Sequence, residues 1–337
     1  MTQPRSDVRH AYISGTGFFV PEKVVTNDDL AAIMDTSDEW IQERTGIQTR
    51  RFAADGEGTT DLAIPAVEEA LKSASLTVDD IDLIIFATCT PDHYLPGSGC
   101  LLQDRMGFRE IGALDIRVQC SGFVYGLSIA DQYIKTGVYR NILLIGAEAQ
   151  SSGLDLSDEG RDVSVIFGDG AGAAIISATE EDRGILSTHL HSEGKYAREL
   201  WVESPSTRNN PTISTADLEA GRHRLKMNGR EVFRHAVARF PEAIVEALQA
   251  NNLNMDDITL VIPHQANLRI SQMVANRLGG PNDLIYSNIQ KYGNTTAASI
   301  PIAMAEAISE GRIQSGDYVV LVAFGSGFTW ASALIKW

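Results

Sequence analysis

Cys120, His264 and Asn294 are the residues of this chain whose types and surroundings best fit an active site. A cysteine thiolate is a nucleophile, while imidazole and carboxamide side chains can donate hydrogen bonds to a developing negative charge. The three residues lie far apart in the sequence, so the fold must bring them together. The elements that flank each residue indicate how it does so.

Cys120 lies where a strand pattern changes to a helix pattern. Residues 114–120 form an alternating, strand-like run that ends at the cysteine. An apolar helix pattern begins directly after it, with Val124, Leu127, Ile129, Ala130 and Ile134. The unpaired amides and the dipole of a helix N-terminus favour a thiolate, so this position predicts a reactive cysteine. The same context is missing at Cys89 and Cys100, and Cys89 is interpreted as a small buried hydrophobic residue.

His264 and Asn294 also lie at the ends of predicted elements. His264 follows a buried strand within residues 261–267, and Asn294 precedes a helix within residues 292–301. Because all three residues lie at strand-to-helix corners, we expect these corners to meet at one site.

Other motifs give weaker signals. His189 and His191 would share one face of a strand, but no further ligand stands at a suitable spacing, so no metal site is predicted. The glycine-rich residues 168–172 precede a strand, whereas a dinucleotide cradle joins a strand to a helix, so we expect tight packing there. Residues 325–327, Gly-Ser-Gly, follow the predicted last buried strand and have a permissive backbone.

The composition is typical of a globular protein without a nucleic-acid partner. The 337 residues are 44% hydrophobic and 21% charged, and the chain is long enough for two domains or one large one. A net charge of −16 disfavours binding to nucleic acid, which requires a basic surface. We find no apolar run near the ~20 residues of a membrane span, no signal-peptide pattern and too few cysteines for a disulfide framework. We therefore expect a cytoplasmic protein with no membrane association.

A basic segment interrupts this acidic chain. Within residues 222–239 six basic side chains are opposed only by Glu231; they are Arg222, Arg224, Lys226, Arg230, Arg234 and Arg239. One interpretation is a docking patch for an acidic partner or a phosphorylated ligand. The other is a solvated helix face, and the charge pattern alone leaves both open.

The sequence contains an internal duplication. Residues 78–84 parallel residues 255–261, an offset of 177, and Cys120 with its helix parallels Asn294 with its helix, an offset of 174. Each copy ends in an apolar strand, at residues 142–145 and 319–322. This pattern predicts two related α/β halves, residues 1–180 and 181–337, whose sheets are buried on both faces.

The segments around the three candidate residues resemble β-ketoacyl-acyl carrier protein synthase III, a condensing enzyme of the thiolase superfamily, as do residues 36–47 and 323–330. The resemblance implies the thiolase fold, in which two duplicated α/β halves form a five-layer α-β-α-β-α sandwich. It also implies a homodimeric acyltransferase that needs no metal or redox cofactor.

The reaction implied by the resemblance is a decarboxylative Claisen condensation. An acyl-CoA would react with malonyl-acyl carrier protein through an acyl-cysteine intermediate, which initiates fatty acid biosynthesis. The alternative is a specialised secondary-metabolite condensing enzyme, similar to alkylquinolone-pathway synthases, that uses malonyl-CoA or a longer or aromatic acyl thioester.

The resemblance further implies a role for each matched residue. Cys120, His264 and Asn294 would be catalytic, and the backbone amides of Cys120 and Ser326 would form an oxyanion hole. The residues implied in binding coenzyme A and substrate are Trp40, Arg44, Arg161, Gly229, Asn267 and Leu95. Those implied in docking the carrier protein are Arg230, Arg234 and Arg269.

Two departures from the usual family pattern bear on substrate choice. Leu95 stands where the family often has a phenylalanine that crosses the dimer interface and closes the partner's acyl pocket. Residues 116–119 also differ from the small residue that usually precedes the cysteine. We therefore expect an acyl pocket roomier than an acetyl-only enzyme requires.

Overall fold

The computed structural model describes residues 9–279 and 283–337. Two mixed sheets form its framework. The first has the strand order β1-β7-β6-β4-β5 and consists of β1 (His10–Phe19), β4 (Leu83–Ala87), β5 (Gly112–Ile116), β6 (Asn141–Glu148) and β7 (Gly170–Thr179). The second has the order β11-β12-β13-β8 and consists of β8 (Gly184–Ser192), β11 (Leu260–Pro263), β12 (Tyr318–Gly325) and β13 (Thr329–Lys336).

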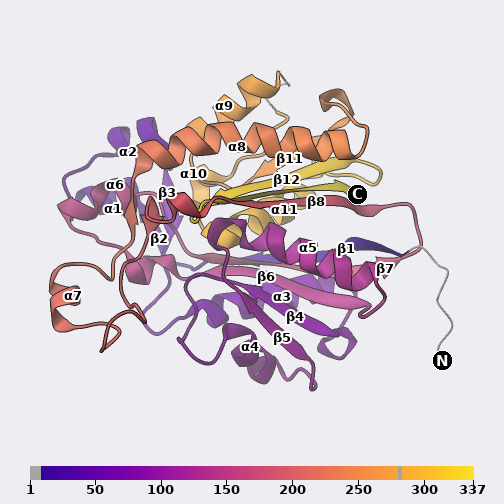
Figure 1. Cartoon of the computed structure of the whole chain (residues 1–337), viewed down its shortest axis with the longest axis horizontal. Coiled ribbons are helices and arrows are strands. Elements are labelled where there is room, and N and C mark those ends of the chain that lie inside the picture. The colour runs from indigo at the N-terminus through magenta and orange to yellow at the C-terminus, as the bar shows by residue number, and fades with distance from the viewer. Residues whose placement is uncertain (1–8, 280–282) are drawn as a thin grey trace.

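Helices lie outside and between these sheets, as Figure 1 shows. The outer face of the first sheet carries α3 (Thr59–Ala74) and α4 (Ser98–Met106), and that of the second carries α8 (Gly229–Ala250) and α9 (Leu268–Leu278). Between the sheets lie α5 (Gly122–Lys135) and α11 (Ser299–Ser309). Because α11 touches protein on all sides, it is buried along most of its length. The five-layer α-β-α-β-α sandwich predicted from the sequence is confirmed.

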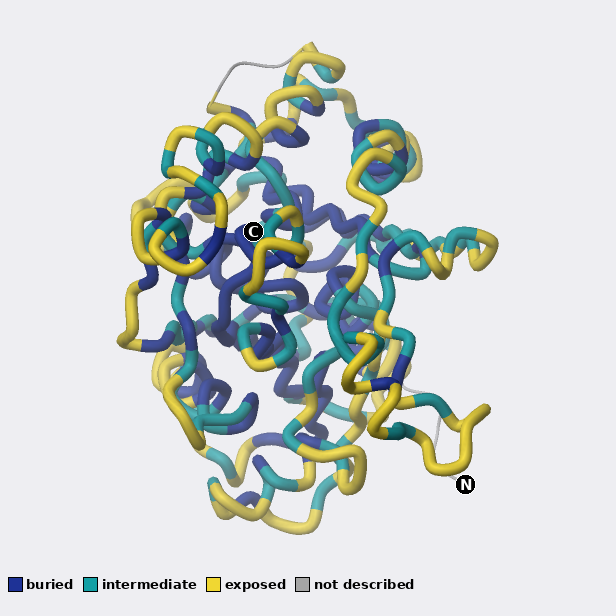
Figure 2. Tube along the Cα trace, turned by 90° about the vertical axis from the view of Figure 1, so that its left-hand side faces the viewer, coloured by how far each residue is buried: buried dark blue, intermediate teal, exposed yellow. Residues whose placement is uncertain are grey.

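Shorter elements gather at one end of the sandwich (Figure 1). They are β2 (Val24–Thr26), α1 (Asn27–Ala31), α2 (Asp38–Thr45), β3 (Thr49–Arg51), α6 (Arg161–Ser164), β9 (Leu200–Trp201), α7 (Thr215–Glu219), β10 (Lys226–Met227) and α10 (Ile289–Tyr292). Figure 2 shows buried chain through the middle of the molecule and exposed chain around it. Within the described residues, no helix is both long and apolar enough to cross a membrane.

The internal duplication is present in the fold. β4 begins at Leu83 and β11 at Leu260, which reproduces the offset between the repeated segments 78–84 and 255–261, and β6 and β12 begin at Asn141 and Tyr318 with the same offset. The strand order β1-β7-β6-β4 of the first sheet corresponds to β8-β13-β12-β11 of the second. The duplicated halves that the sequence predicts are therefore real structural repeats. The proposed division at residue 180 falls between β7 and β8 and stays a prediction.

Three local expectations need correction. The helices α5 and α11 begin at Gly122 and Ser299, which is the same offset of 177 that relates the strands. The predicted offset of 174 relates only the ends of these helices, because α5 has 14 residues and α11 has 11. The strand before the cysteine ends at Ile116, and a 3₁₀ turn, Gln119–Ser121, separates it from α5. Gly325 is the last residue of β12, and residues 326–327 lead from it toward the buried strand β13, so this segment precedes the last buried strand.

Candidate active site

Cys120, His264 and Asn294 line one cavity of about 460 Å³ near the end of the sandwich where the short elements gather. Cys120 comes from the first half of the chain, and the other two residues come from the second. This volume lies in the range of small-molecule sites. The fold therefore brings together the three corners that the sequence singled out.

Cys120 lies in the 3₁₀ turn that leads into α5, and only 6% of its surface is exposed. Gly325, the last residue of β12, packs directly against it. A Cβ atom at residue 325 would lie 2.8 Å from the Cβ atom of Cys120 and 3.1 Å from its backbone nitrogen. Such distances are too short for any side chain, so a glycine is needed where β12 meets the cysteine.

Two opposing influences act on the pKa of the Cys120 thiol. Burial, with a smaller effect from the carboxyl group of Glu148, raises the pKa of the Cys120 thiol to about 12. The backbone amides of Cys120 and Ser326 act in the opposite direction on this pKa, because they donate hydrogen bonds toward the sulfur. Burial of the sulfur therefore opposes the thiolate that a helix N-terminus favours.

Glu148 is a completely buried carboxyl group at the end of β6 that the sequence analysis did not identify. It accepts hydrogen bonds from Thr90 Oγ1 at 2.5 Å, from the Cys89 amide at 3.1 Å and from Cys89 Sγ at 3.3 Å. Burial raises its pKa. Glu148 therefore fixes residues 88–90 beside the cavity, and Cys89 makes a polar contact that its interpretation as a buried hydrophobic residue does not include.

His264 follows β11 and is 2% exposed. Its backbone N–H donates to the carbonyl oxygen of Val322 at 2.8 Å, which extends the pairing of β11 with β12. Its Nδ1 atom lies 2.6 Å from the hydroxyl oxygen of Ser299. Burial lowers the pKa of His264 to about 3, so the ring is neutral at physiological pH.

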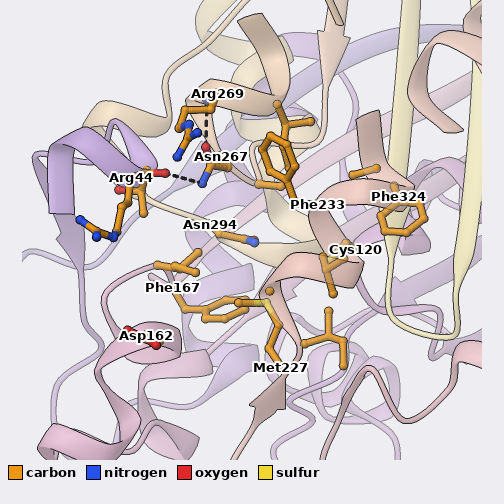
Figure 3. Close-up of a pocket in the computed structure, with 18 of the residues that line it drawn as sticks. Arg44, Cys120, Asp162, Phe167, Met227, Phe233, Asn267, Arg269, Asn294 and Phe324 are labelled. Atoms are coloured by element: carbon orange, nitrogen blue, oxygen red, sulfur yellow. Dashed lines mark hydrogen bonds between the residues drawn. The ribbon is translucent and has the colours of Figure 1, made fainter. Parts of the chain in front are cut away.

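Asn294 is held by its backbone and by its own side-chain oxygen. Its N–H donates to the carbonyl oxygen of Ile166 at 2.9 Å, and its carbonyl oxygen accepts from the Gly168 N–H at 3.1 Å. Its Oδ1 atom accepts the N–H of Thr296 at 2.9 Å. The amide nitrogen Nδ2 is therefore the group offered to the cavity, and Figure 3 shows it directed toward Cys120.

Trp40 lies at the outer part of the cavity with two arginines over its ring. The guanidinium carbons of Arg44 and Arg161 lie 4.3 and 4.8 Å from the ring centroid. Trp40 and Arg44 line the cavity, whereas Arg161 does not, and the neighbouring Asp162 lines it instead. Arg161 also donates to the carbonyl oxygen of Asp35 at 2.6 Å. Trp40, Arg44 and Arg161 are thus close together, as expected, but Arg161 does not itself line the cavity.

Asn267 and Gly229 also line the cavity. Both polar groups of the Asn267 side chain have partners: Nδ2 donates to the carbonyl oxygen of Arg44 at 2.8 Å, and Oδ1 accepts the N–H of Arg269 at 2.9 Å (Figure 3). Asn267 therefore ties α2 to the start of α9. Gly229 begins α8, and a Cβ atom there would meet only the terminal methyl group of Met227, at 3.7 Å.

The three residues implied in carrier-protein docking are not equivalent. Arg230 and Arg269 line the cavity and, within the part of the chain that the structure describes, neither has a carboxylate within 4.0 Å. Arg234 is one helical turn further along α8, outside the lining, and pairs with Glu231 at 2.5 Å. Arg230 and Arg269 are thus the cations available at the entrance.

Leu95 does not reach the cavity of its own chain. It lies in the loop before α4 and is 79% exposed. Its expected contact with a partner's acyl pocket requires a second chain and stays a prediction.

Apolar side chains make up most of the wall, and the sequence analysis missed them. They are Val165, Ile166, Phe167, Leu200, Met227, Val232, Phe233, Ala236, Ala266, Ile270 and Phe324. Those on α8 follow helical spacing, which is also the pattern of an ordinary core face, so no sequence signal separates the two. Among residues 9–279 and 283–337 no group of three or more His, Cys, Asp or Glu could hold a metal ion.

Comparisons with known proteins identify one family. Residues 114–194 match the family model described as 3-Oxoacyl-[acyl-carrier-protein (ACP)] synthase III, and residues 248–337 match the model of its C terminal. The chain is 48% identical over 327 residues to a β-ketoacyl-[acyl-carrier-protein] synthase III of Clostridioides difficile (strain 630), covering 97% of this chain and 98% of the relative.

Two solved structures show the same similarity. The 3-oxoacyl-[acyl-carrier-protein] synthase III from Aquifex aeolicus VF5 superposes with a TM-score of 0.89 at 42% identity, covering 97% of this chain and all (100%) of that one. The β-ketoacyl-[acyl carrier protein] synthase III from Thermus thermophilus gives 0.90 at 43% identity, covering 97% and 99%.

Proposed function

The chain belongs to the 3-oxoacyl-[acyl-carrier-protein] synthase III family, and on that premise we propose which of its groups carry out each step. The protein is an enzyme that condenses an acyl-CoA with malonyl-acyl carrier protein and so initiates fatty acid biosynthesis. The secondary-metabolite alternative gains no support from the comparisons. One observation carries the residue assignment: a single cavity holds a thiol together with two neutral hydrogen-bond donors.

The first step is transfer of the acyl group to Cys120. The sulfur attacks the thioester carbonyl of acyl-CoA, the new carbon–sulfur bond forms, and the bond to the coenzyme A sulfur breaks. The proton of the Cys120 thiol ends on the coenzyme A thiol. The amides of Cys120 and Ser326 would hold the oxyanion of the tetrahedral intermediate, and their closeness to the sulfur supports this role.

The second step is loss of carbon dioxide from the malonyl thioester. The electron pair of the broken carbon–carbon bond moves to the thioester oxygen, and the resulting enolate needs hydrogen-bond donors. His264, which is neutral, and the Nδ2 group of Asn294 would supply them. The enolate carbon then attacks the carbonyl of acyl-Cys120. This forms the β-ketoacyl product on the carrier protein and releases the Cys120 sulfur, which takes up a proton from water.

Binding of the two substrates uses the outer part of the cavity. We assign the adenine of coenzyme A to the ring of Trp40 and its phosphates to Arg44 and Arg161, because both guanidinium groups already lie over that ring. The acidic carrier protein would dock on Arg230 and Arg269, the cations at the entrance that have no carboxylate partner among the described residues.

We propose that the enzyme is a homodimer joined through β5. This strand is the edge of the first sheet, and Leu114 within it is 37% exposed. Tyr94 and Leu95, in the loop before α4, are 76% and 79% exposed, the highest values of any large apolar side chain among the described residues. An unpaired strand edge with exposed apolar side chains favours contact with a second chain. Light scattering should give twice the chain mass, and a stable monomer would contradict the proposal.

The proposed reaction uses no metal or redox cofactor, because neither step needs an outside oxidant or reductant, and the one proton that the overall reaction consumes comes from water. We propose a cytoplasmic location, where acyl-CoA and the acyl carrier protein are available.

The residue assignment can be tested by separating the two steps. His264→Ala and Asn294→Ala should still form one acyl group per chain when mixed with acyl-CoA, as measured by the mass of the intact protein. Each should lose about 10²–10³ in the rate of carbon dioxide release from malonyl-acyl carrier protein, the usual cost of removing one oxyanion donor. If both variants failed to acylate while staying folded, the division of roles would be wrong.

The roomier acyl pocket expected from the sequence has its own test. An acyl-CoA series of increasing length should show turnover beyond acetyl-CoA, and Leu95→Phe should shift the preference toward shorter chains. Turnover with acetyl-CoA alone would refute the expectation.

A further inference from the structure

Ser299 and His264 form a buried polar pair beside the cavity. Ser299 is the first residue of α11, and both side chains are 2% exposed. The hydroxyl oxygen of Ser299 lies 2.6 Å from Nδ1 of His264. Among the described residues it makes one other hydrogen bond, which it accepts from the backbone N–H of Gln265 at 3.4 Å.

The position of the hydrogen atoms follows from these contacts. A serine hydroxyl has one hydrogen to donate, and an amide N–H can only donate. If Nδ1 carried the imidazole proton, the Ser299 oxygen would accept from both Nδ1 and Gln265, and its own hydrogen would have no acceptor within the described part of the chain. If the hydroxyl donates to Nδ1, then Nδ1, the Ser299 hydroxyl and the Gln265 N–H all have partners, and the remaining N–H, at Nε2, belongs to the residue that lines the cavity. An unpaired buried donor costs about 1–3 kcal/mol, so the second arrangement is favoured.

We propose that Ser299 is a positioning residue that holds His264 as the Nε2–H tautomer, so that the ring offers a hydrogen-bond donor to the cavity. The inference rests on the proposed function, in which His264 donates to the enolate oxygen. Nδ1 is occupied by Ser299, which leaves Nε2 as the remaining polar atom of a residue that lines the cavity. The other tautomer would present a bare acceptor to a negatively charged oxygen.

The same short segment also orients the second donor. The N–H of Thr296 binds Oδ1 of Asn294 and thereby turns Nδ2 to the cavity, while Ser299, three residues later, binds His264. Residues 296–299, where the 3₁₀ turn Thr296–Ala298 passes into α11, therefore set the hydrogen-bonding direction of both side chains. This gives the start of α11 a function besides packing between the sheets.

Ser299→Ala tests the inference through the two separate steps. Formation of acyl-Cys120 should stay within about twofold of the wild-type rate. Release of carbon dioxide from malonyl-acyl carrier protein should fall about 10²-fold, toward the loss expected for one donor. Ser299→Thr keeps the hydroxyl and should recover most of the activity. The matched control is Ser332→Ala, which removes another buried hydroxyl, one that binds the carbonyl oxygen of Ala243 at 2.8 Å, and it should leave both rates unchanged.

Nitrogen NMR of histidine-labelled protein provides a readout that a purely structural role would not change. The signals of His264, assigned with His264→Asn, should show a protonated Nε2 and an unprotonated Nδ1 in the wild type. In Ser299→Ala they should show a mixture of tautomers or a protonated Nδ1. A protonated Nδ1 in the wild type, or an unchanged pattern and unchanged rates in Ser299→Ala, would overturn the inference.

The outcomes separate this inference from the proposed function. If His264→Ala releases carbon dioxide at the wild-type rate, the role of His264 in the reaction is wrong, and the NMR measurement still decides whether Ser299 sets the tautomer. If His264→Ala is impaired and Ser299→Ala is not, only the inference about Ser299 fails. An equal fall in both steps for Ser299→Ala would indicate a structural defect and would also overturn it.

Discussion

The corner that carries Cys120 and the corner that carries Asn294 are built from corresponding elements and used for opposite purposes. In each, a 3₁₀ turn leads into a buried central helix, and α5 and α11 begin at equivalent positions of the two repeats. Cys120 stands two residues before α5, where the second half has Ala297. Asn294 lies five residues before α11, outside the matching position. The nucleophile and the donor are thus not exchanged copies of one residue.

The strand ends of the two halves differ in the same way. Glu148 ends β6 and Gly325 ends β12, at corresponding positions of the repeat. Glu148 binds residues 88–90 of its own half, whereas Gly325 leaves room for Cys120 of the other half. Likewise Ala87 ends β4 at the position where His264 follows β11. The duplicated framework provides the positions, and a few replacements assign the nucleophile to one half and the donors to the other.

Backbone strain accompanies function at both corners. Gln119, directly before the nucleophile, has a φ of 44°, and Thr296, whose amide holds Asn294, has a φ of 49°. Residues other than glycine rarely adopt this region, and doing so costs of the order of 1 kcal/mol. Each corner therefore has an unfavourable backbone conformation at a residue that positions a functional group, Gln119 for Cys120 and Thr296 for Asn294.

The largest expected effect tests whether the corner that carries Cys120 supplies the nucleophile. Cys120→Ala should lower condensation by about 10⁴–10⁶, as expected when a nucleophile is removed, and no acyl group should be found on the intact protein by mass spectrometry. Cys100→Ala, which removes an exposed cysteine, should keep full acylation. An acyl group retained by Cys120→Ala would place the nucleophile elsewhere.

Gly325→Ala tests whether the second half makes room for the first. The new Cβ atom would lie 2.8 Å from that of Cys120, so the cysteine or β12 must shift. We expect acyl-Cys120 formation to fall up to about 10²-fold, because small misplacements of a reacting group have effects of that size. Overpacking should also lower the free energy of unfolding by about 1–3 kcal/mol.

A matched control for this substitution is Gly153→Ala. A Cβ atom at residue 153 would meet nothing within 4 Å, so both the acylation rate and the melting temperature should stay unchanged. Acylation at the wild-type rate in Gly325→Ala would show that the close contact between the halves is not required.

Much of this arrangement could be predicted from the sequence, because its signals are local. Cys120, His264 and Asn294 stand at changes of hydrophobic period, and the duplication is visible as repeated residues. The contacts that complete the site are not local. Glu148 looks like the polar end of a strand, and Ser299 looks like a helix start, until the fold places each beside a partner from a distant segment.

The sequence also does not show what sets the pKa of Cys120. It shows the helix that favours a thiolate, but desolvation depends on how completely the two halves close over the sulfur. Similarly, the spacing of Arg230 and Arg234 predicts a shared helix face, yet only the structure shows that Glu231 neutralises Arg234 and not Arg230.

Burial of His264, the other donor of the second half, should affect stability in acid. Burial lowers the pKa of His264 to about 3 in the folded protein, against 6.5 for an ordinary histidine. Between these values the unfolded chain binds more protons than the folded one, so this group makes the protein less stable as pH falls from 6.5 toward 3. The slope contributed by one group is at most about 1.4 kcal/mol per pH unit.

Denaturant unfolding at a series of pH values measures this slope. His264→Asn should flatten it between pH 6.5 and about 3, while His93→Asn, at an exposed position, should not. Equal slopes for the wild type and His264→Asn would mean that the imidazole of His264 is not held neutral by burial.

The smallest expected effects concern the outer layers of the two halves. The outer layer of the second half consists of α8 and α9, and it places Arg230 and Arg269 at the cavity entrance. Among the described residues neither of these cations has a carboxylate partner. Arg230→Glu and Arg269→Glu should each raise the KM for malonyl-acyl carrier protein about three- to tenfold, with a smaller effect for malonyl-CoA and a smaller difference at high salt. Arg234→Glu should have less effect, because Glu231 already pairs with Arg234. Arg105→Glu on α4, the corresponding outer layer of the first half, should have none.

Equal effects from all four substitutions would mean that the carrier protein responds to the net charge of the enzyme rather than to the cavity entrance. A dominant effect of Arg234→Glu would mean that the ion pair between Arg234 and Glu231 opens when the carrier protein docks.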